Sequence, residues 1–259
     1  MPMRALVRRP SPQLADGLVT HIDRTPVDAE LAQHQWTGYV DALQSAGWQT
    51  IEVPAAPEAA DSAFVEDTVV MFRDTAIIAH PGAPSRVGET EATAATLRNL
   101  GYRIKPMTTG HLDGGDVLKI DDTVYVGRGG RTDAAGVAEF RALLEPLGAK
   151  VIAVPLHKAL HLKSAVTALP DGTVIGYSPV VDDPGFFPHY LDMPEEGGAH
   201  VVDLGLGRLL MAASAPQSAE RIADLGYTPV VVDISEFEKL EGCVTCLSVR
   251  LRHDPQNPL

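Results

Sequence analysis

Residues 116–126 read DVLKIDDTVYV, two short β-rich runs joined by an acidic pair that is typical of a hairpin turn. A helix-like stretch follows at residues 133–147. Next comes Gly148, at the point where a helix C-terminus favours a left-handed residue. A further β-rich run at residues 151–154 completes the unit. We therefore predict a module of strand, strand, helix and strand.

The same order of elements recurs along the chain. Paired β-rich runs occur at residues 68–72 and 75–80, 116–120 and 123–126, and 164–169 and 173–177. Helix-like stretches that end near a glycine span residues 32–46, 88–100, 133–147 and 216–225, and short strands follow at 50–53, 103–105, 151–154 and 229–233. With a weaker stretch at 160–204, this gives about five ββαβ units of roughly fifty residues.

An ordinary doubly wound sheet alternates one strand with one helix, so the extra hairpin in each unit disfavours that alternative. We expect an α/β protein in which residues 1–259 form a single domain built by radial repetition. The last strand, at residues 247–251, has no module of its own and is expected to close the ring beside residues 5–8. Such a ring leaves a central channel where several modules can contribute to one site.

Composition limits the classes of function. A formal net charge of −13 argues against a nucleic-acid surface, and no apolar run is long enough to span a membrane. Two cysteines in 259 residues do not form a disulfide framework, and the N-terminus lacks a signal-peptide pattern, so we expect a cytoplasmic protein. A homodimer is compatible with the sequence, which does not determine the oligomeric state.

Cys246 lies in residues 241–251, EGCVTCLSVRL, at the mouth of the last predicted strand, where a loop can present a side chain to the channel. With Cys243 it forms a C-x-x-C pair. A thioredoxin-like redox pair would precede a helix, and a structural zinc site would need a second ligand pair. A buried structural cysteine remains the alternative for Cys246 and is the preferred interpretation of Cys243.

Other side chains able to do chemistry stand where the repeats begin. His157 and His161 are four residues apart, but no HExxH pattern accompanies them and a strand follows, so we do not expect a metal. His161 enters the fourth repeat at the position where Asp113 enters the third. Asp116 follows a double glycine and is expected to bond turn amides. An acidic cluster at residues 61–67 opens the second repeat, although a solvated loop would look similar.

Taken together, these segments resemble the dimethylarginine dimethylaminohydrolase family of the guanidino-group modifying superfamily. The matching stretches are Asp61–Asp67 (DSAFVED), residues 81–86 (PGAPSR), 112–118 (LDGGDVL), 130–132 (GRT), 160–164 (LHLKS) and 242–248 (GCVTCLS). They occur in the family's order and span nearly the whole chain. The resemblance implies a five-bladed α/β propeller, or pentein, which agrees with the repeat count.

The resemblance also implies roles for individual residues. Cys246 would be the nucleophile, His161 the general base and acid, and Asp113 the carboxylate that orients His161. The implied substrate contacts are Asp67 with the neighbouring Glu66 for the guanidinium, Asp61 for the α-ammonium, Arg86 and Arg131 for the α-carboxylate, Phe64 for the aliphatic stem, and Leu18 as a lid residue.

The expected reaction is hydrolysis of free Nω-methylated arginine to citrulline and an alkylamine through a thiouronium on Cys246. Carboxylates hold the planar cation, the thiolate adds, and His161 protonates the leaving amine. Neither a metal nor an organic cofactor is expected. The alternatives are a deiminase of unmethylated arginine, an amidinotransferase and a non-catalytic binding propeller. The joint presence of Cys246, His161 and Asp113 argues against the binding propeller.

Overall fold

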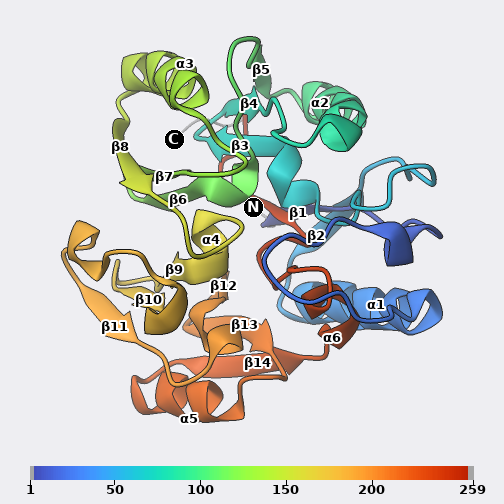
Figure 1. The fold of residues 1–259 in the computed structure, drawn as a ribbon, viewed down its shortest axis with the longest axis vertical. Helices are drawn as coiled ribbons and strands as arrows, with labels where there is room; N and C mark the ends of the chain where they lie inside the picture. The colour runs from blue at the N-terminus through green and yellow to red at the C-terminus, as the bar shows by residue number, and fades with distance from the viewer. Residues whose placement is uncertain (1–2, 256–259) are drawn as a thin grey trace.

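The computed structural model describes residues 3–255, which contain five three-stranded sheets arranged in a ring (Figure 1). In each sheet the middle strand is antiparallel to the inner strand and parallel to the outer one. The inner strands are β3 (Val69–Phe72), β6 (Val117–Ile120), β9 (Val166–Ala168), β12 (Val202–Gly205) and β15 (Val249–Leu251). All five line a cavity along the axis of the ring.

The middle and outer strands complete the blades. The middle strands are β1 (Arg4–Val7), β4 (Thr75–Ile78), β7 (Thr123–Arg128), β10 (Val174–Gly176) and β13 (Arg208–Ala212). The outer strands are β2 (Gln49–Glu52), β5 (Arg103–Pro106), β8 (Lys150–Pro155), β11 (Tyr190–Asp192) and β14 (Thr228–Val232).

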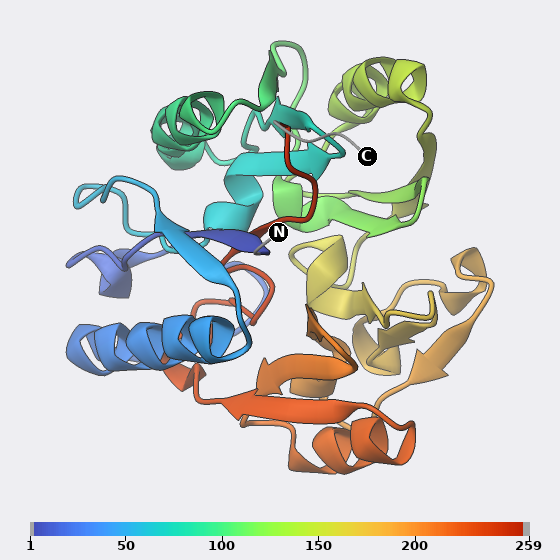
Figure 2. The ribbon, with the colours of Figure 1, turned by 180° about the vertical axis from the view of Figure 1, so that it is seen from behind.

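Helices connect the middle and outer strands and lie around the outside of the ring (Figure 2). They are α1 (Ala29–Ser45), α2 (Thr90–Asn99), α3 (Ala134–Leu144) and α5 (Pro216–Asp224). The predicted glycines Gly47, Gly101, Gly148 and Gly226 all have φ between 90° and 93°, the left-handed region in which a Cβ is unfavourable. The fourth blade has 3₁₀ turns in place of this helix.

The repeat architecture predicted from the sequence is confirmed. The expected hairpins form, and the ring closes through β15, which pairs antiparallel with β1 so that Leu251 faces Arg4. Two details differ. The strand expected from residue 164 starts at Val166, because the one-turn helix α4 (Leu162–Ala165) precedes it. The fifth blade's β12–β13 hairpin was not singled out by its sequence.

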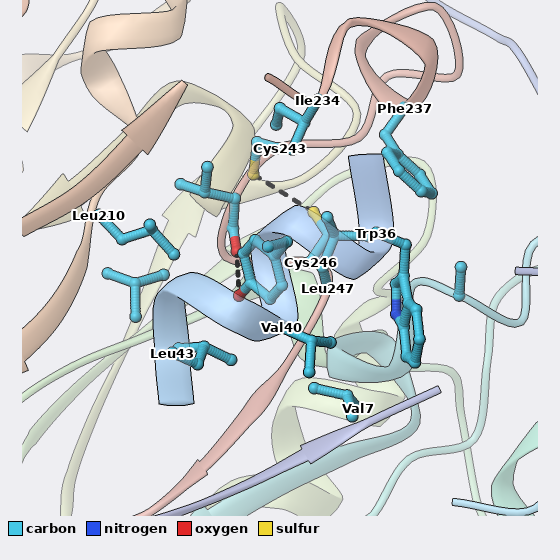
Figure 3. Close-up of a cluster of buried hydrophobic side chains, with 14 of the residues drawn as sticks. Val7, Trp36, Val40, Leu43, Leu210, Ile234, Phe237, Cys243, Cys246 and Leu247 are labelled. Carbon is cyan, nitrogen blue, oxygen red and sulfur yellow. Dashed lines mark hydrogen bonds between the residues drawn. The ribbon is translucent and has the colours of Figure 1, made fainter. Parts of the chain in front are cut away.

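The hydrophobic core is divided among the blades. One cluster combines α1, the one-turn helix α6 (Ser235–Glu238) and the segment that precedes β15, and Figure 3 shows Trp36, Val40 and Leu43 in this cluster with Cys243, Cys246 and Leu247. Tyr39 is fully buried in the same cluster, and its hydroxyl contacts Val244 O at 2.8 Å and Ser248 Oγ at 2.7 Å. No helix within residues 3–255 is long and apolar enough to cross a membrane.

Replacing Tyr39 with Phe should lower the free energy of unfolding by about 1–3 kcal/mol, because it leaves buried polar partners unsatisfied. The measurement is urea unfolding followed by circular dichroism. Tyr190→Phe is the control, since that hydroxyl makes only contacts of 3.4 and 3.5 Å near the surface. Equal losses in the two variants would contradict a role for Tyr39 in holding α1 against the 244–248 segment.

Candidate active site

The chemically competent side chains gather at one mouth of the ring, because each stands just before an inner strand. Asp67 precedes β3, Asp113 precedes β6, His161 precedes β9, and Cys246 precedes β15. A small pocket of about 20 Å³ lies here, lined by Leu18, Asp61, Phe64, Asp67, Arg86, Arg131, Leu160, His161, Leu240, Glu241, Gly242 and Cys246. Its volume is close to that of a single water molecule, so a larger ligand requires side chains to move.

His161 is buried among carboxylates. Its Nε2 lies 3.0 Å from Asp113 Oδ2, and its Nδ1 lies 3.8 Å from Asp67 Oδ1. Asp113 is itself fixed by the amide of Gly82, which donates to Oδ1 at 2.8 Å. Burial disfavours a charged imidazole, but Asp67, Asp113 and Asp116 outweigh it and raise the pKa of His161 to about 9. Both ring nitrogens of His161 are therefore protonated at neutral pH, and the side chain is a cation.

Asp116 positions this histidine through the backbone. It is fully buried and accepts hydrogen bonds from the Leu162 amide at 3.0 Å and from Thr132 Oγ1 at 2.6 Å. Burial raises the pKa of Asp116 to about 6. The sequence predicted a carboxylate bonding turn amides, and the amide that it bonds belongs to the residue after His161.

Gly115 makes the close approach of these groups possible. A Cβ on this residue would lie 2.6 Å from Asp67 Oδ1 and 2.7 Å from His161 Nδ1. Its amide also donates to Asp67 Oδ1 at 2.9 Å. Any side chain here would push the carboxylate and the imidazole apart.

Asp67 is paired with an internal guanidinium. Arg86 Nη1 lies 2.5 Å from Asp67 Oδ2, and the rest of the Arg86 guanidinium bonds Glu89 and the carbonyls of Asp61 and Phe64. Burial opposes ionisation of Asp67, but the charges of His161 and Arg86 prevail and lower its pKa to about 2. Arg86 lines the pocket as expected, with each of its guanidinium nitrogens already engaged.

Cys246 is buried beside a second thiol. Its Sγ lies 3.3 Å from Cys243 Sγ, and Figure 3 shows the two sulfurs facing each other. The hydrogen bond with Cys243, burial, and the negative charges of Glu66 and Asp67 raise the pKa of Cys246 well above its ordinary value. Cys243 was expected to be a structural cysteine without chemistry, yet it directly contacts the proposed nucleophile.

Glu66 lies elsewhere than its expected role requires. Neighbouring residues of the 3₁₀ turn Val65–Thr68 point in different directions, so Asp67 lines the pocket and Glu66 lines the axial cavity. Glu66 Oε1 lies 2.6 Å from Lys163 Nζ and 2.7 Å from Arg250 Nη2. Its Oε2 is buried without a hydrogen-bond partner within residues 3–255. The structure therefore does not place Glu66 in the lining of the pocket beside Asp67.

The N-terminal loop borders the pocket, and Leu18 belongs to the lining. The amide of Leu18 donates to Asp61 Oδ1 at 3.0 Å, and the amides of Thr20 and His21 donate to Glu241 at 2.8 and 2.5 Å. Leu18 therefore lies where a lid residue was expected. Glu241 was not singled out from the sequence, although it adjoins the Cys243–Cys246 segment and has a positive φ of 60°.

Arg131 is less constrained than Arg86. Its Nη1 lies 3.8 Å from Asp113 Oδ2, and its side chain is 12% exposed at the pocket. In the part of the chain that the structure describes, no group of three or more His, Cys, Asp or Glu side chains could hold a metal ion.

Comparison with known proteins places this geometry in context. The arginine deiminase family model matches residues 64–200. An N(G),N(G)-dimethylarginine dimethylaminohydrolase of Streptomyces coelicolor is 64% identical, covering 96% of this chain and 97% of the relative. The enzyme of the same name from Pseudomonas aeruginosa is 34% identical over 95% of this chain and 98% of its own.

Solved structures show the same fold. A cysteine-to-serine mutant of the Pseudomonas aeruginosa protein, complexed with citrulline, superposes with a TM-score of 0.89. It is 33% identical and covers 97% of this chain and 100% of its own. A histidine-to-glycine variant of a dimethylarginine dimethylaminohydrolase, in adduct with S-methyl-L-thiocitrulline, has a TM-score of 0.90 at 32% identity, with the same coverage. The five-bladed architecture is thus shared with these structures.

Asp113→Asn should lower the pKa of His161 by a unit or more from about 9, since one of its stabilising charges is removed. The imidazole titration is followed by NMR. In the wild type, the charged imidazole stabilises the fold fully below pH 6.5, and this contribution is lost as the pH rises through about 9. The variant should show a smaller loss of stability over that window. An unchanged His161 titration would contradict the proposed pairing.

Cys246 should be protonated near neutral pH, with a thiolate titration midpoint above the ordinary value of about 8.5, because two carboxylates and a second thiol face it. Ultraviolet thiolate absorbance, with Cys246→Ser as the baseline, measures this midpoint. Cys243→Ser removes the neighbouring sulfur and serves as the matched variant. A midpoint below about 6, typical of a stable cysteine–histidine ion pair, would refute this expectation.

Proposed function

The chain belongs to the dimethylarginine dimethylaminohydrolase family, and we propose that Cys246 and His161 carry out its reaction. This reaction is the hydrolysis of free Nω-methylated arginine to citrulline and an alkylamine. The observation that supports these roles most is that Cys246, His161 and Asp67 line one pocket at the mouth of the ring. A nucleophile, a proton donor and a carboxylate that recognises cations therefore meet within reach of one small ligand.

We assign the substrate's guanidinium to the carboxylate of Asp67. A guanidinium is planar and resonance-stabilised, and a forked carboxylate holds it in plane while keeping it cationic. A positive charge beside Cys246 also lowers the cost of forming the thiolate, whose pKa is raised in the ligand-free geometry. Substrate binding therefore activates the nucleophile that attacks it, and the thiol proton passes to solvent because His161 is already protonated.

The chemical steps then follow from the charge of His161. The Cys246 thiolate adds to the guanidinium carbon, and the alkylamine leaves with a proton from the imidazolium, which Asp113 holds in place. A covalent thiouronium remains on Cys246. Neutral His161 then takes a proton from water, and hydroxide adds to the same carbon. The intermediate expels the sulfur, which takes up the hydroxyl proton, and this gives citrulline and restores the Cys246 thiol.

Arg131 is proposed as the main contact for the substrate's α-carboxylate, because its guanidinium is the less engaged of the two arginines at the pocket. Arg86 is committed to Asp67 and Glu89, so it joins that contact only by exchanging a partner. Asp61, whose Oδ1 accepts the Leu18 amide, is proposed to receive the α-ammonium. The same bond would couple ligand binding to the position of the lid.

We further propose that residues 1–259 act as a single catalytic domain in the cytoplasm. Every blade contributes an inner strand to one axial cavity, which supports a single domain. The free thiols of Cys243 and Cys246 support a reducing compartment. The homodimer stays a prediction.

Citrulline assays with dimethylarginine, monomethylarginine and arginine test the reaction itself, and preferential turnover of unmethylated arginine would favour the deiminase alternative.

Cys246→Ser should abolish turnover while substrate affinity stays within about tenfold, since the charged contacts to the ligand are untouched. Cys243→Ser is the matched control and should remain active. Citrulline release gives turnover, and calorimetric titration gives affinity. If the phenotypes of the two variants were exchanged, Cys243 would be the nucleophile.

Arg131→Met should raise KM about 10- to 150-fold, because a charge-assisted contact to a carboxylate contributes roughly 1.5–3 kcal/mol. For the same reason, methylarginine inside a peptide should not be a substrate, since its α-carboxylate is an amide. Initial rates on the free amino acid and on a methylarginine tripeptide check both points. Efficient amine release from the tripeptide would overturn this assignment.

A further inference from the structure

A second cavity, with a volume of about 610 Å³, lies along the axis of the ring and is lined by residues from all five inner strands. Glu66 and Thr245 adjoin Asp67 and Cys246 in sequence, and Lys163 follows His161 by two residues, so these three stand at its end nearest the active site. Glu66 pairs there with Lys163 and Arg250, and the two cavities share no lining residue. The axial cavity is therefore distinct from the pocket in which the reaction occurs.

Positive charge is concentrated in this cavity, although the protein as a whole carries a formal net charge of −13. Four of the cations that line it are Lys119, Lys163, Arg250 and Arg252, of which Lys119 and Arg252 are exposed. Lys163 and Arg250 share the single carboxylate of Glu66, and Arg252 pairs with Asp203 at 3.1 Å. Four cations thus face two carboxylates, which leaves a surplus of two positive charges.

Two further acids lie in the exposed β6–β7 turn at the rim. Asp122 pairs there with Arg73 at 2.9 Å, and the side chain of Asp122 is 64% exposed. Asp121 is also exposed. With Arg73 included, the whole lining holds five basic and four acidic side chains, so the cavity keeps a surplus of one positive charge when the rim is counted.

Lys119 is the cation without a counter-ion. Its Nζ donates to the carbonyl of Met71 at 2.5 Å, and within residues 3–255 no carboxylate lies within ion-pair distance of it. The surrounding protein and the charges of Lys163, Arg250 and Arg252 lower the pKa of Lys119, although its side chain is exposed at the cavity. A negative ligand would relieve this repulsion.

We propose that the axial cavity is a binding site for a small oxyanion, such as phosphate, held by Lys119, Lys163, Arg250 and Arg252. The surplus of positive charge in the lining favours an anion over a neutral ligand. Arginine and lysine together supply both the fork geometry and the point charges that phosphate oxygens accept. Attraction of anions to the whole protein cannot account for such binding, because the overall charge is strongly negative.

The test is calorimetric titration of the full-length protein with inorganic phosphate at neutral pH, with chloride at matched ionic strength as the reference. We expect one saturable site and, because a bound anion raises the pKa of Lys119, proton uptake that appears as a dependence of the heat on the buffer. Binding should persist in saturating citrulline, which occupies the arginines of the active site. Loss of phosphate binding in citrulline would assign the anion to the active site and overturn the proposal.

Lys119→Met should weaken phosphate binding at least tenfold, whereas Lys119→Arg should retain it. Lys150→Met is the matched control, because Lys150 is an exposed lysine on β8 of the same blade and lies outside the cavity lining. Melting temperatures in the absence of phosphate verify that each variant folds. Equal binding by wild type and Lys119→Met, or no binding beyond that of chloride, would refute the site.

Discussion

Buried negative charge at one mouth of the ring is the constraint on which the rest of the site depends. Asp61, Asp67, Asp113 and Asp116 are all less than 9% exposed, and ionised carboxylates in such surroundings require positive partners or strong hydrogen bonds. Inside the protein, Arg86, Arg131 and His161 supply the positive charge. The site is consequently unfavourable for a thiolate and favourable for a cationic ligand, and these two properties have the same cause.

The ring explains how these groups come together from distant parts of the sequence. Asp67, Asp113, His161 and Cys246 each stand within a few residues of the start of an inner strand, and all inner strands run away from the same mouth. Residues that stand before the inner strands of different repeats therefore lie around the same mouth of the ring. The fold therefore allows the acid, the histidine and the cysteine to be contributed by separate blades, while every blade keeps its own hydrophobic core.

Much of this arrangement could be predicted from the sequence, because the repeat leaves local signals such as hairpin turns and glycines at helix ends. The β12–β13 hairpin was not predicted, because its turn has a bulky residue, Leu206, at positive φ, where a glycine or asparagine is expected. Side-chain direction was the other limit. Glu66 and Asp67 are neighbours in a 3₁₀ turn. Only the structure shows that Glu66 lines the axial cavity whereas Asp67 lines the pocket of the active site. The contact between Cys243 and Cys246 likewise depends on a turn that the sequence does not specify.

The blade that carries Cys246 has a particular consequence for biosynthesis. Its sheet joins β1 and β2, which precede the other four blades in the chain, to β15, which follows them. Four blades are each built from one continuous stretch of chain and can form as the ribosome proceeds. The blade of β1, β2 and β15 cannot form until Leu251 has been synthesised and pairs with Arg4. A chain that ends before β15 therefore lacks the complete blade that positions Cys246, the proposed nucleophile.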